Sequence, residues 1–343
     1  MQLHDFDFHL PSENIAIRPA VPRDSAKLLH VDGDAPFANK IVSDLPNLLR
    51  AGDILVFNDT KVIPAQLEGR RGEARIGVTL HKRIDLRSWQ AFVRNGKRLK
   101  PGQQIIFGAD VTAHATDKLP DGSFYIRFDG DEPVETLLHR AGTMPLPPYI
   151  AAKRNIDERD YDDYQTMFAD KEGAVAAPTA ALHFTPELMD NLARAGILTA
   201  TLTLHVGAGT FLPVKVENVA DHKMHAEWGV IEPETADKIN NVRANGGRVI
   251  AVGTTSLRLM ESAAGDDGLL HPFSGETDIF ITPGYEFKII NGLMTNFHLP
   301  KSTLFMLVSA LMGRAKMQHI YAHAIKNDYR FYSYGDSSLL LPE

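Results

Sequence analysis

The sequence predicts an α/β main domain that is interrupted by an inserted all-β domain, and three observations lead to this prediction. The chain has 343 residues, more than one average domain contains. Helical and strand-like patterns alternate along the second half of the chain, which is typical of α/β folds. Short strand-like runs separated by turn residues fill residues 66–148, which is typical of small β domains. We therefore expect residues 1–65 and 149–343 to form the main domain and residues 66–148 to form the insertion.

The main domain begins with an apolar run at residues 54–57, which predicts a buried strand that ends at the polar turn of residues 58–60. A helix is predicted over residues 186–195, because Thr185 can cap it and Pro186 suits its first turn. The same reasoning predicts strands at residues 197–206, 248–252, 278–282 and 287–293, and helices at residues 233–244, 302–313 and 315–328.

The insertion contains four strand-like runs, at residues 75–81, 89–93, 104–107 and 123–128. Turn-forming pairs such as Asn95-Gly96 and Asp121-Gly122 separate them. Strands spaced this closely predict either a small barrel or a sandwich. The proline-rich residues 144–150 end the insertion and are typical of a rigid linker.

The composition excludes several kinds of chemistry. The chain has no cysteine, which excludes disulfides, thiolate zinc sites, a cysteine nucleophile and a thiolate-ligated iron–sulfur cluster. His319 and His323 have metal-ligand spacing, but a third ligand is missing and we expect no metal site. The N-terminus lacks a signal-peptide pattern, and the apolar residues 303–313 fall short of the roughly 20 needed to span a bilayer. We therefore expect a soluble, cytoplasmic protein without a membrane partner.

Positive charge is concentrated in one window of the insertion. Residues 70–100 hold ten Lys and Arg against two acidic residues, a net charge of +8, whereas the whole chain carries −7. The remainder of the chain therefore carries −15. A basic island on an acidic body suggests a surface that binds a polyanion. The alternative is a set of solvated strand faces without a partner.

Two loops after predicted strands carry residue types that bind anions or ribose. Residues 253–256, Gly-Thr-Thr-Ser, precede a predicted helix whose free N–H groups favour an anion, and Arg258 could add a fixed charge. The alternative is ordinary capping of that helix by the hydroxyls. Residues 205–211 leave a strand with His205 and two glycines, which allow a ligand to approach closely. The alternative is a tight turn with an incidental histidine.

Two further loops carry imidazole groups, at His183 and His298. Residues 176–184 are small and apolar and suit one wall of a pocket for a flat ring, and residues 295–300 combine an amide with His298. Such loops meet at the carboxyl edge of a sheet, so we expect one composite site there for a nucleotide-like ligand. The sequence contains no complete P-loop, GxGxxG loop or GxSxG elbow.

Ten blocks carry a resemblance to one family. They are DFDFHLP (5–11), AGDILVFNDTKVIPAQL (51–67), PLPPYI (145–150), AVAAPTAALHF (174–184), LHVGAGTF (204–211), KMHAEW (223–228), VIAVGTTSLR (249–258), ITPGYEF (281–287), LMTNFHLPKSTL (293–304) and YSYGDSSLLL (332–341). In order and across nearly the whole chain, they resemble the S-adenosylmethionine:tRNA ribosyltransferase-isomerase family of queuosine synthesis. The departures are small: Ala181 stands where the family has glycine, and Lys61 and Gln66 stand where arginine is commoner.

The resemblance implies a specific reaction. The family transfers the ribosyl part of S-adenosylmethionine to 7-aminomethyl-7-deazaguanine (preQ1) at the tRNA wobble position and isomerises it, which gives epoxyqueuosine and releases adenine and methionine. It implies an α/β domain with an inserted β-barrel, and preQ1-bearing tRNA as the partner. It also implies S-adenosylmethionine as a consumed co-substrate, no prosthetic group, and a monomer.

The matching blocks supply residue types for this chemistry, which needs a base beside the sulfonium and an acid for the departing adenine. We assign the acid and base roles to His183 and His205, with His298 and Asp59 next in line. The candidates for binding S-adenosylmethionine are Thr179, Phe184, Gly207, Gly209, Thr210, Thr254, Thr255 and Arg258. The candidates for binding tRNA are Arg70, Arg71, Arg75, Lys82 and Arg83.

Two other functions stay open from the residues alone. An enzyme that cleaves S-adenosylmethionine or a nucleoside without acting on RNA would explain the loops but not the basic window. A non-enzymatic RNA-binding module would explain the basic window but not the loops.

Overall fold

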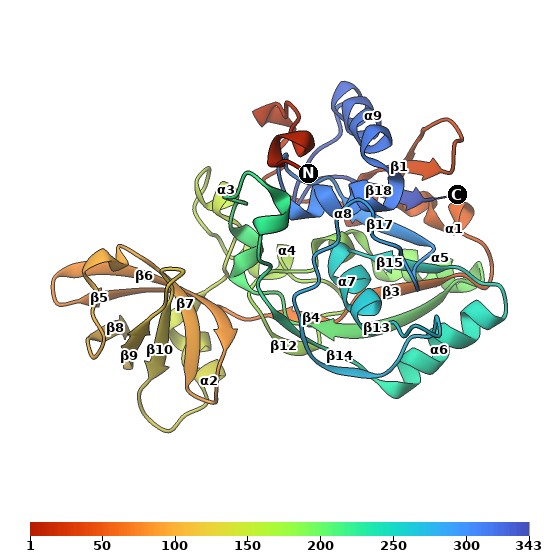
Figure 1. The fold of residues 1–343 in the computed structure, drawn as a ribbon. Helices are drawn as coiled ribbons and strands as arrows, with labels where there is room; N and C mark the ends of the chain where they lie inside the picture. Colours follow the sequence, from red (N-terminus) through yellow and green to blue (C-terminus); the bar gives the residue numbers. More distant parts are fainter. Residues whose placement is uncertain (343) are drawn as a thin grey trace.

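The computed structural model describes residues 1–342, except that for residue 98 it describes the backbone alone. The chain forms an α/β main domain with an inserted β-barrel (Figure 1). The predicted fold class is therefore confirmed. The barrel projects from one end of the main domain, and both termini lie on the main domain (Figure 1). Within the described residues, no helix is both long enough and apolar enough to cross a membrane.

Nine strands form one mixed sheet. In order across the sheet they are β16 (Phe273–Thr277), β14 (Glu227–Ile231), β13 (Leu198–Leu204), β3 (Ile54–Asn58), β15 (Val249–Val252), β17 (Gly292–Asn296), β18 (Ser337–Leu341), β1 (Lys27–Asp32) and β2 (Ala38–Ile41). The four strands β13, β3, β15 and β17 run parallel to one another, so their carboxyl ends share one edge. The barrel begins eight residues after β3 ends, so this edge faces the barrel.

Helices cover both faces of this sheet. The helices are α1 (Leu45–Leu48), α5 (Pro186–Arg194), α6 (Pro233–Ala244), α7 (Thr254–Ser262), α8 (Thr303–Met312) and α9 (Arg314–Lys326). Along β3, Ile54 and Val56 belong to the core formed with α6–α9, whereas Leu55 and Phe57 belong to the core formed with α1 and α5. Because side chains alternate along a strand, burial on both faces explains the continuous apolar run of β3.

Six antiparallel strands close the inserted barrel, because β5 pairs with both β6 and β8. Around the barrel they are β5 (Gln66–Arg71), β6 (Ala74–Arg83), β7 (Ser88–Arg94), β10 (Phe124–Phe128), β9 (Val111–Lys118) and β8 (Gln104–Gly108). β11 (Gly142–Thr143) pairs with the first two residues of β5. The helix α2 (Val134–Ala141) adds apolar side chains to the barrel core. Closure leaves no open strand edge among the six, and the insertion is a barrel rather than a sandwich.

The two chain segments that connect the domains are paired with each other. The outgoing β4 (Thr60–Val62) runs parallel to the returning β12 (Lys171–Ala174). Between the barrel and β12, the chain forms two short helices, α3 (Pro148–Ala151) and α4 (Arg159–Asp163). The strand pair therefore fixes the entry and exit of the barrel at the carboxyl end of β3.

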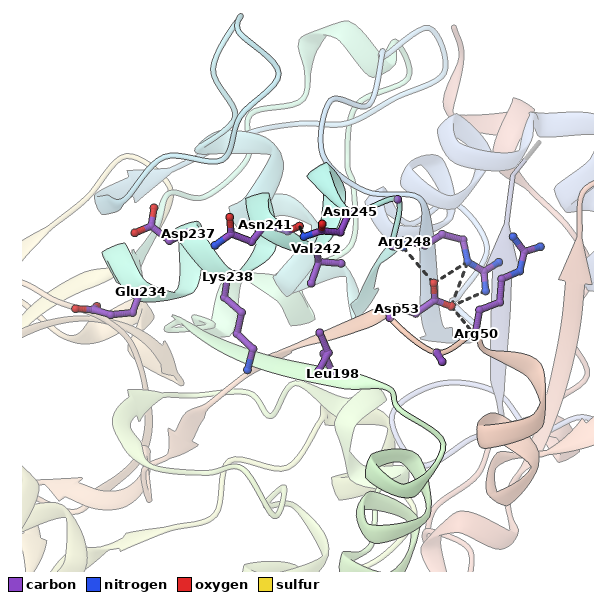
Figure 2. A pocket seen from close by; sticks show the side chains of 14 residues that line it. Arg50, Asp53, Leu198, Glu234, Asp237, Lys238, Asn241, Val242, Asn245 and Arg248 are labelled. Atoms are coloured by element: carbon purple, nitrogen blue, oxygen red, sulfur yellow. Dashed lines mark hydrogen bonds and ion pairs between the residues drawn. The ribbon is translucent and has the colours of Figure 1, made fainter.

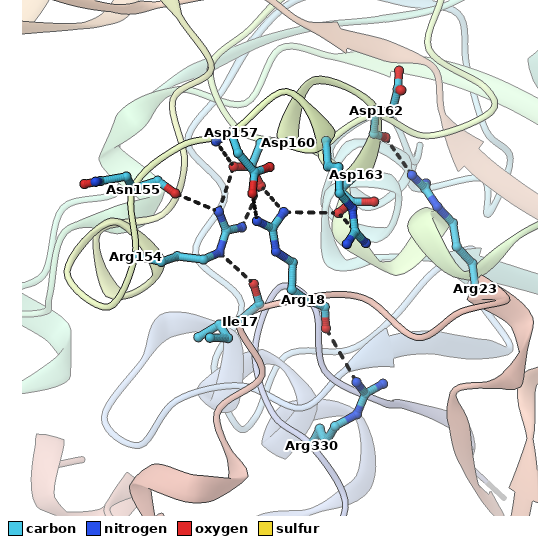
Figure 3. Close-up of polar contacts among 11 residues, drawn as sticks. Ile17, Arg18, Arg23, Arg154, Asn155, Asp157, Asp160, Asp162, Asp163 and Arg330 are labelled. Atoms are coloured by element: carbon cyan, nitrogen blue, oxygen red, sulfur yellow. Dashed lines mark hydrogen bonds and ion pairs between the residues drawn. The ribbon is translucent and has the colours of Figure 1, made fainter.

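A buried ion cluster holds the returning segment against both ends of the chain (Figure 3). Asp160 is fully buried and accepts hydrogen bonds from Arg154 at 2.6 and 2.7 Å and from Arg18 at 2.9 Å. The Arg18 carbonyl in turn accepts a hydrogen bond from Arg330. Burial raises the pKa of Asp160, but the hydrogen bonds from Arg154 and from a backbone N–H outweigh burial and keep this pKa below its usual value. The N–H of Tyr164, which lines the site described below, donates to the Asp160 carbonyl at 3.1 Å.

Several predicted elements have different bounds in the structure. The helix predicted at residues 233–244 is confirmed as α6. The strand predicted at residues 278–282 is wrong: these residues are irregular, and the strand lies earlier, at β16, where it pairs with β14. The strand predicted at residues 287–293 is displaced to β17. Sequence patterns also missed β5, β9 and α2, because their buried positions are set by closure of the barrel.

Candidate active site

A pocket lies at the carboxyl edge of the central strands, where several segments of the chain meet. The loops after β13, β15 and β17 contribute to it, together with the segment before α5 and the loop before β18. Its lining includes six residues that the sequence indicated: Thr179, Thr210, Thr254, Thr255, Arg258 and His298. The loops expected to meet at this edge therefore share one cavity, with a free volume of about 90 Å³, but His183, His205 and Asp59 do not line it.

The first turn of α7 presents its polar groups to this pocket. Gly253 precedes the helix with φ +88°, a conformation that favours glycine. No side chain among the described residues caps the helix, and the Ser256 hydroxyl donates to the Val252 carbonyl instead. The Thr255 hydroxyl is buried and has no hydrogen-bond partner within the described part of the chain. Ordinary capping does not explain this sequence, and the helix N-terminus remains open to an anionic ligand.

Arg258 is held by a buried carboxylate. Its Nη1 lies 2.6 Å from Glu227 Oε2, and both side chains are 6% exposed. Glu227 also accepts the Gly207 N–H at 3.2 Å, so one carboxylate joins α7, β14 and the loop after β13. Arg258 Nη2 is buried without a hydrogen-bond partner among the described residues. Nη1 is therefore held by Glu227 and Nε by the Ile279 carbonyl at 3.3 Å, and Nη2 is left for a ligand.

His183 is buried and does not line the pocket, but it contacts Asn296, which does. Its Nε2 lies 3.1 Å from Asn296 Oδ1. The Asn296 amide nitrogen donates to the carbonyls of Tyr332 and Ser333, so its oxygen faces His183 and the imidazole proton is on Nε2. Tyr332 has φ +75°, a strained conformation for this residue type. His183 and Asn296 thus hold the strained loop that forms one wall of the pocket.

His298 and Asp59 occupy different surroundings. His298 lines the pocket, lies 3.2 Å from Thr295 Oγ1, and has its pKa lowered by burial to about 3, so the ring is neutral. Asp59 follows β3 and accepts a hydrogen bond from the Thr203 hydroxyl at 2.6 Å. Burial, reinforced by the nearby Asp170 charge, raises the pKa of Asp59.

His205 lies in a second pocket, between the barrel and the sheet, with a volume of about 600 Å³. Its Nδ1 is 2.8 Å from the Thr60 hydroxyl, and its ring stacks on Trp228 with centroids 5.7 Å apart and an interplanar angle of 15°. Burial lowers the pKa of His205, and the positive charge of Arg83 adds to this effect, so the imidazole is neutral. The structure therefore separates His205 from His298 by placing them in two adjoining pockets.

The two glycines after His205 contact the barrel. A Cβ atom at Gly207 would lie 2.6 Å from His81 Nδ1, and one at Gly209 would lie 2.6 Å from the His225 ring. The Gly209 N–H donates to His81 Nδ1, which places the ring proton on Nε2. These glycines let the loop pack against His81 of the barrel. The remaining candidate for the small-molecule pocket, Phe184, packs edge-on against Phe57 in the core.

The candidate tRNA-binding residues fall into two groups. Lys82 and Arg83 line the second pocket and form ion pairs with Glu276 at 2.6 Å and Glu135 at 3.0 Å. The three arginines of the first hairpin, Arg70, Arg71 and Arg75, lie near the β5–β6 turn, where residues 70 and 75 are opposite each other. Arg71 and Arg75 line a groove of about 720 Å³ with two further cations, Lys97 and Lys118. The side chain of Arg98 lies outside the described residues. Sequence analysis missed Lys118, because β9 was not recognised.

A hollow lies at the amino edge of the main sheet, and the charged pair of Asp53 and Arg248 within it joins two strands (Figure 2). Asp53, 2% exposed, pairs with Arg248 at 2.6 Å and accepts the backbone N–H of Arg50 at 2.8 Å. Burial raises the pKa of Asp53, but the hydrogen bonds from Arg248 and Arg50 outweigh burial and lower it. The pair joins the start of β3 to the start of β15.

The described residues contain no group of three or more acidic or histidine side chains that could hold a metal ion. Fold and site together define an α/β enzyme with a polar pocket at a sheet edge and an inserted barrel that carries a basic groove. A family model described as queuosine biosynthesis protein matches residues 3–340, and the chain belongs to this family.

Similar proteins bear out the resemblance of the sequence blocks. The chain is 71% identical to the S-adenosylmethionine:tRNA ribosyltransferase-isomerase of Novosphingobium aromaticivorans over 342 residues, which is 100% of both chains. It is 64% identical to the protein of that name from Zymomonas mobilis over 343 residues, again 100% of both. The crystal structure of S-adenosylmethionine tRNA ribosyltransferase from Thermotoga maritima is 32% identical, with a TM-score of 0.56, and the match covers 98% of this chain and 100% of that chain.

Glu227 and Trp228 are residues of these pockets that sequence reasoning did not single out, and the amide that it noted in residues 295–300 is Asn296. Glu227 and Trp228 belong to the KMHAEW block and Asn296 to the LMTNFHLPKSTL block, so the resemblance marked the segments. Only the fold shows that Glu227 meets Arg258 and that Trp228 meets His205.

Proposed function

We propose that this protein transfers the ribosyl part of S-adenosylmethionine to preQ1 at the tRNA wobble position and isomerises it, releasing adenine and methionine. One observation carries the proposal: Thr255 Oγ1 and Arg258 Nη2 are buried at the α7 N-terminus without partners among the described residues. A hydroxyl, a guanidinium and a helix N-terminus together suit a carboxylate, which S-adenosylmethionine carries. Family membership and the names of similar proteins support the same reaction.

In this proposal the methionine carboxylate binds at Thr255 and Arg258, and the hydroxyls of Thr179, Thr210 and Thr254 hold the ribose. The pocket volume of about 90 Å³ is below the roughly 300 Å³ or more of typical small-molecule sites. In this proposal the surrounding loops move apart when the co-substrate binds.

The reaction needs a base that removes a proton from the carbon beside the sulfonium. His205 is our candidate, because its imidazole is neutral and lines the adjoining pocket. His298 lines the first pocket and is our candidate to hydrogen-bond adenine, and Asp59, which follows β3 and has a raised pKa, is our candidate acid. His183 acts through Asn296 as a positioning residue. If His183→Ala and His205→Ala both keep near-native turnover and normal tRNA binding, these assignments are wrong.

Several organisational features complete the proposal. The groove of Arg71 and Arg75 binds tRNA phosphates, with Arg70 beside it, while Lys82 and Arg83 contribute charge nearer the second pocket.

Residues 66–148 act as a separate domain inserted between residues 1–65 and 149–343. We also propose that the protein works as a cytoplasmic monomer without a prosthetic group.

The test is a release assay with purified protein, S-adenosylmethionine and preQ1-bearing tRNA. We expect adenine and methionine to appear in equal amounts, and only when this tRNA is present. Adenine release without tRNA would instead indicate an enzyme that cleaves S-adenosylmethionine or a nucleoside. Tight tRNA binding without any release would indicate a binding module.

A further inference from the structure

The second pocket, between barrel and sheet, has an open aromatic platform. Trp228 is 43% exposed, and its indole ring stacks on His205. His205 is held from behind, because a Cβ atom at Gly173 would lie 2.8 Å from its Cε1, and from the side by the Thr60 hydroxyl. Trp228 therefore rests on a ring that cannot turn, which suits stacking by a flat heterocycle.

A second feature of this pocket is an unused hydrogen-bond donor. Trp89 reaches it from the barrel and is 2% exposed. Its indole nitrogen is buried and has no hydrogen-bond partner among the residues that the structure describes. Buried indole N–H groups normally find an acceptor, so a ligand that carries a carbonyl oxygen would complete this site.

The lining of the pocket carries an excess of negative charge. It includes five carboxylates, from Asp85, Glu135, Glu172, Glu227 and Glu276, against the two cations Lys82 and Arg83. The Lys82–Glu276 pair is 32% and 48% exposed, and Glu172 pairs with the exposed Lys61. Exposed pairs of this kind contribute little stability, so a ligand ammonium can replace the lysine at either glutamate.

From this geometry we infer that the second pocket is the subsite for a flat heterocycle that carries a carbonyl oxygen and an amine cation. The heterocycle stacks on Trp228, its oxygen accepts from Trp89, and its ammonium binds Glu276 or Glu172. The inference rests on the proposed function for the identity of this heterocycle, which is then the preQ1 base of the wobble nucleotide. The carboxylates would also select preQ1 over bases that lack the ammonium.

The position of the subsite agrees with a transfer reaction. Glu227 lines this pocket, and its partner Arg258 lines the pocket proposed for S-adenosylmethionine. One buried ion pair therefore separates the two cavities, so a base in one and a ribosyl donor in the other are neighbours.

The chain contains two tryptophans, and both line this pocket, so intrinsic tryptophan fluorescence reports on it alone. The test is to titrate the full-length protein with free 7-aminomethyl-7-deazaguanine and with its 7-cyano counterpart, which lacks the ammonium. We expect saturable quenching, with the aminomethyl base binding about tenfold more tightly. Glu276→Gln combined with Glu172→Gln should remove this preference, and Glu234→Gln, on α6 and outside this pocket (Figure 2), should keep it.

Equal responses to both bases, or no quenching by the aminomethyl base, would overturn the subsite. A second measurement separates this outcome from failure of the proposed function. With preQ1-bearing tRNA, Trp228→Ala should raise the KM for tRNA at least about tenfold and leave binding of S-adenosylmethionine unchanged. An unchanged KM with normal adenine release would refute the subsite and leave the function standing. Quenching without any adenine release from wild-type protein would refute the function and leave the subsite standing.

Discussion

The buried pair of Arg258 and Glu227 gives the sharpest prediction about how stability and binding are linked. Each side chain is 6% exposed, and the two charged atoms are 2.6 Å apart. Arg258→Met leaves the Glu227 carboxylate buried with only the Gly207 N–H as a hydrogen-bond donor. Removing one partner of a buried pair costs about 3–5 kcal/mol. We expect urea unfolding, followed by far-ultraviolet circular dichroism at neutral pH, to show a loss of this size.

Adding Glu227→Gln to Arg258→Met should recover stability. The glutamine oxygen can still accept the Gly207 N–H, and no charge remains buried at this point. We expect the double variant to be about 2 kcal/mol more stable than Arg258→Met alone, because the two sites are coupled. Binding of S-adenosylmethionine, measured by calorimetry, should stay about tenfold to hundredfold weaker in both variants, because each lacks the guanidinium that binds the carboxylate.

Two results would refute this reasoning. A loss below about 1 kcal/mol in Arg258→Met would mean that the pair is solvated or replaced. A further loss on addition of Glu227→Gln would mean that the carboxylate has a stabilising partner other than Arg258. Wild-type affinity of the double variant for S-adenosylmethionine would separately refute the role of Arg258 in binding.

The remaining predictions concern three other places in the structure. Gly207→Ala places a Cβ atom 2.6 Å from a barrel histidine and should cost about 1–3 kcal/mol in urea unfolding, whereas Gly275→Ala, with its nearest side-chain atom at 3.6 Å, should change stability little. The lowered pKa of Asp53 means that its ionised form stabilises the fold above the unfolded-state pKa of about 3.9, and this contribution disappears as pH falls through the lower folded-state pKa. The difference in unfolding free energy between wild type and Asp53→Asn, about 3 kcal/mol at neutral pH, should therefore shrink below about pH 4, and a constant difference would exclude this pairing. Arg75→Glu should weaken tRNA binding and reduce its dependence on salt by about one phosphate contact. The matched reversal Lys326→Glu on α9 should change neither the affinity for tRNA nor its salt dependence. Equal effects of the two reversals would exclude the barrel groove as the tRNA-binding surface.

The sequence predicted the parts of the fold whose patterns are local. Residues 54–57 form β3 because both faces of the strand are buried, and Thr185 and Pro186 begin α5 as capping preferences predict, with the Thr185 hydroxyl accepting the Leu188 N–H. Local patterns did not predict β16, whose position depends on its pairing with β14, or β5 and β9, whose positions depend on barrel closure.

Local sequence patterns likewise predicted only part of the site. Thr255 and Arg258 were accessible to sequence reasoning, because a glycine and hydroxyls between a strand and a helix form a recognisable anion-binding pattern. Glu227 was not accessible, because a single glutamate carries no pattern until β14 brings it to Arg258. The separation of His205 from His298 likewise depends on the barrel, which forms one side of the second pocket.

The central claim is that the ribosyl group of S-adenosylmethionine is transferred to the wobble base. The most direct measurement is mass spectrometry of nucleosides from preQ1-bearing tRNA after incubation with the protein and S-adenosylmethionine labelled with ¹³C in the ribose. We predict epoxyqueuosine that retains all five labelled carbons, with unlabelled adenine and methionine in solution. Unchanged preQ1 in the tRNA, or a modified nucleoside without the labelled carbons, would contradict the claim.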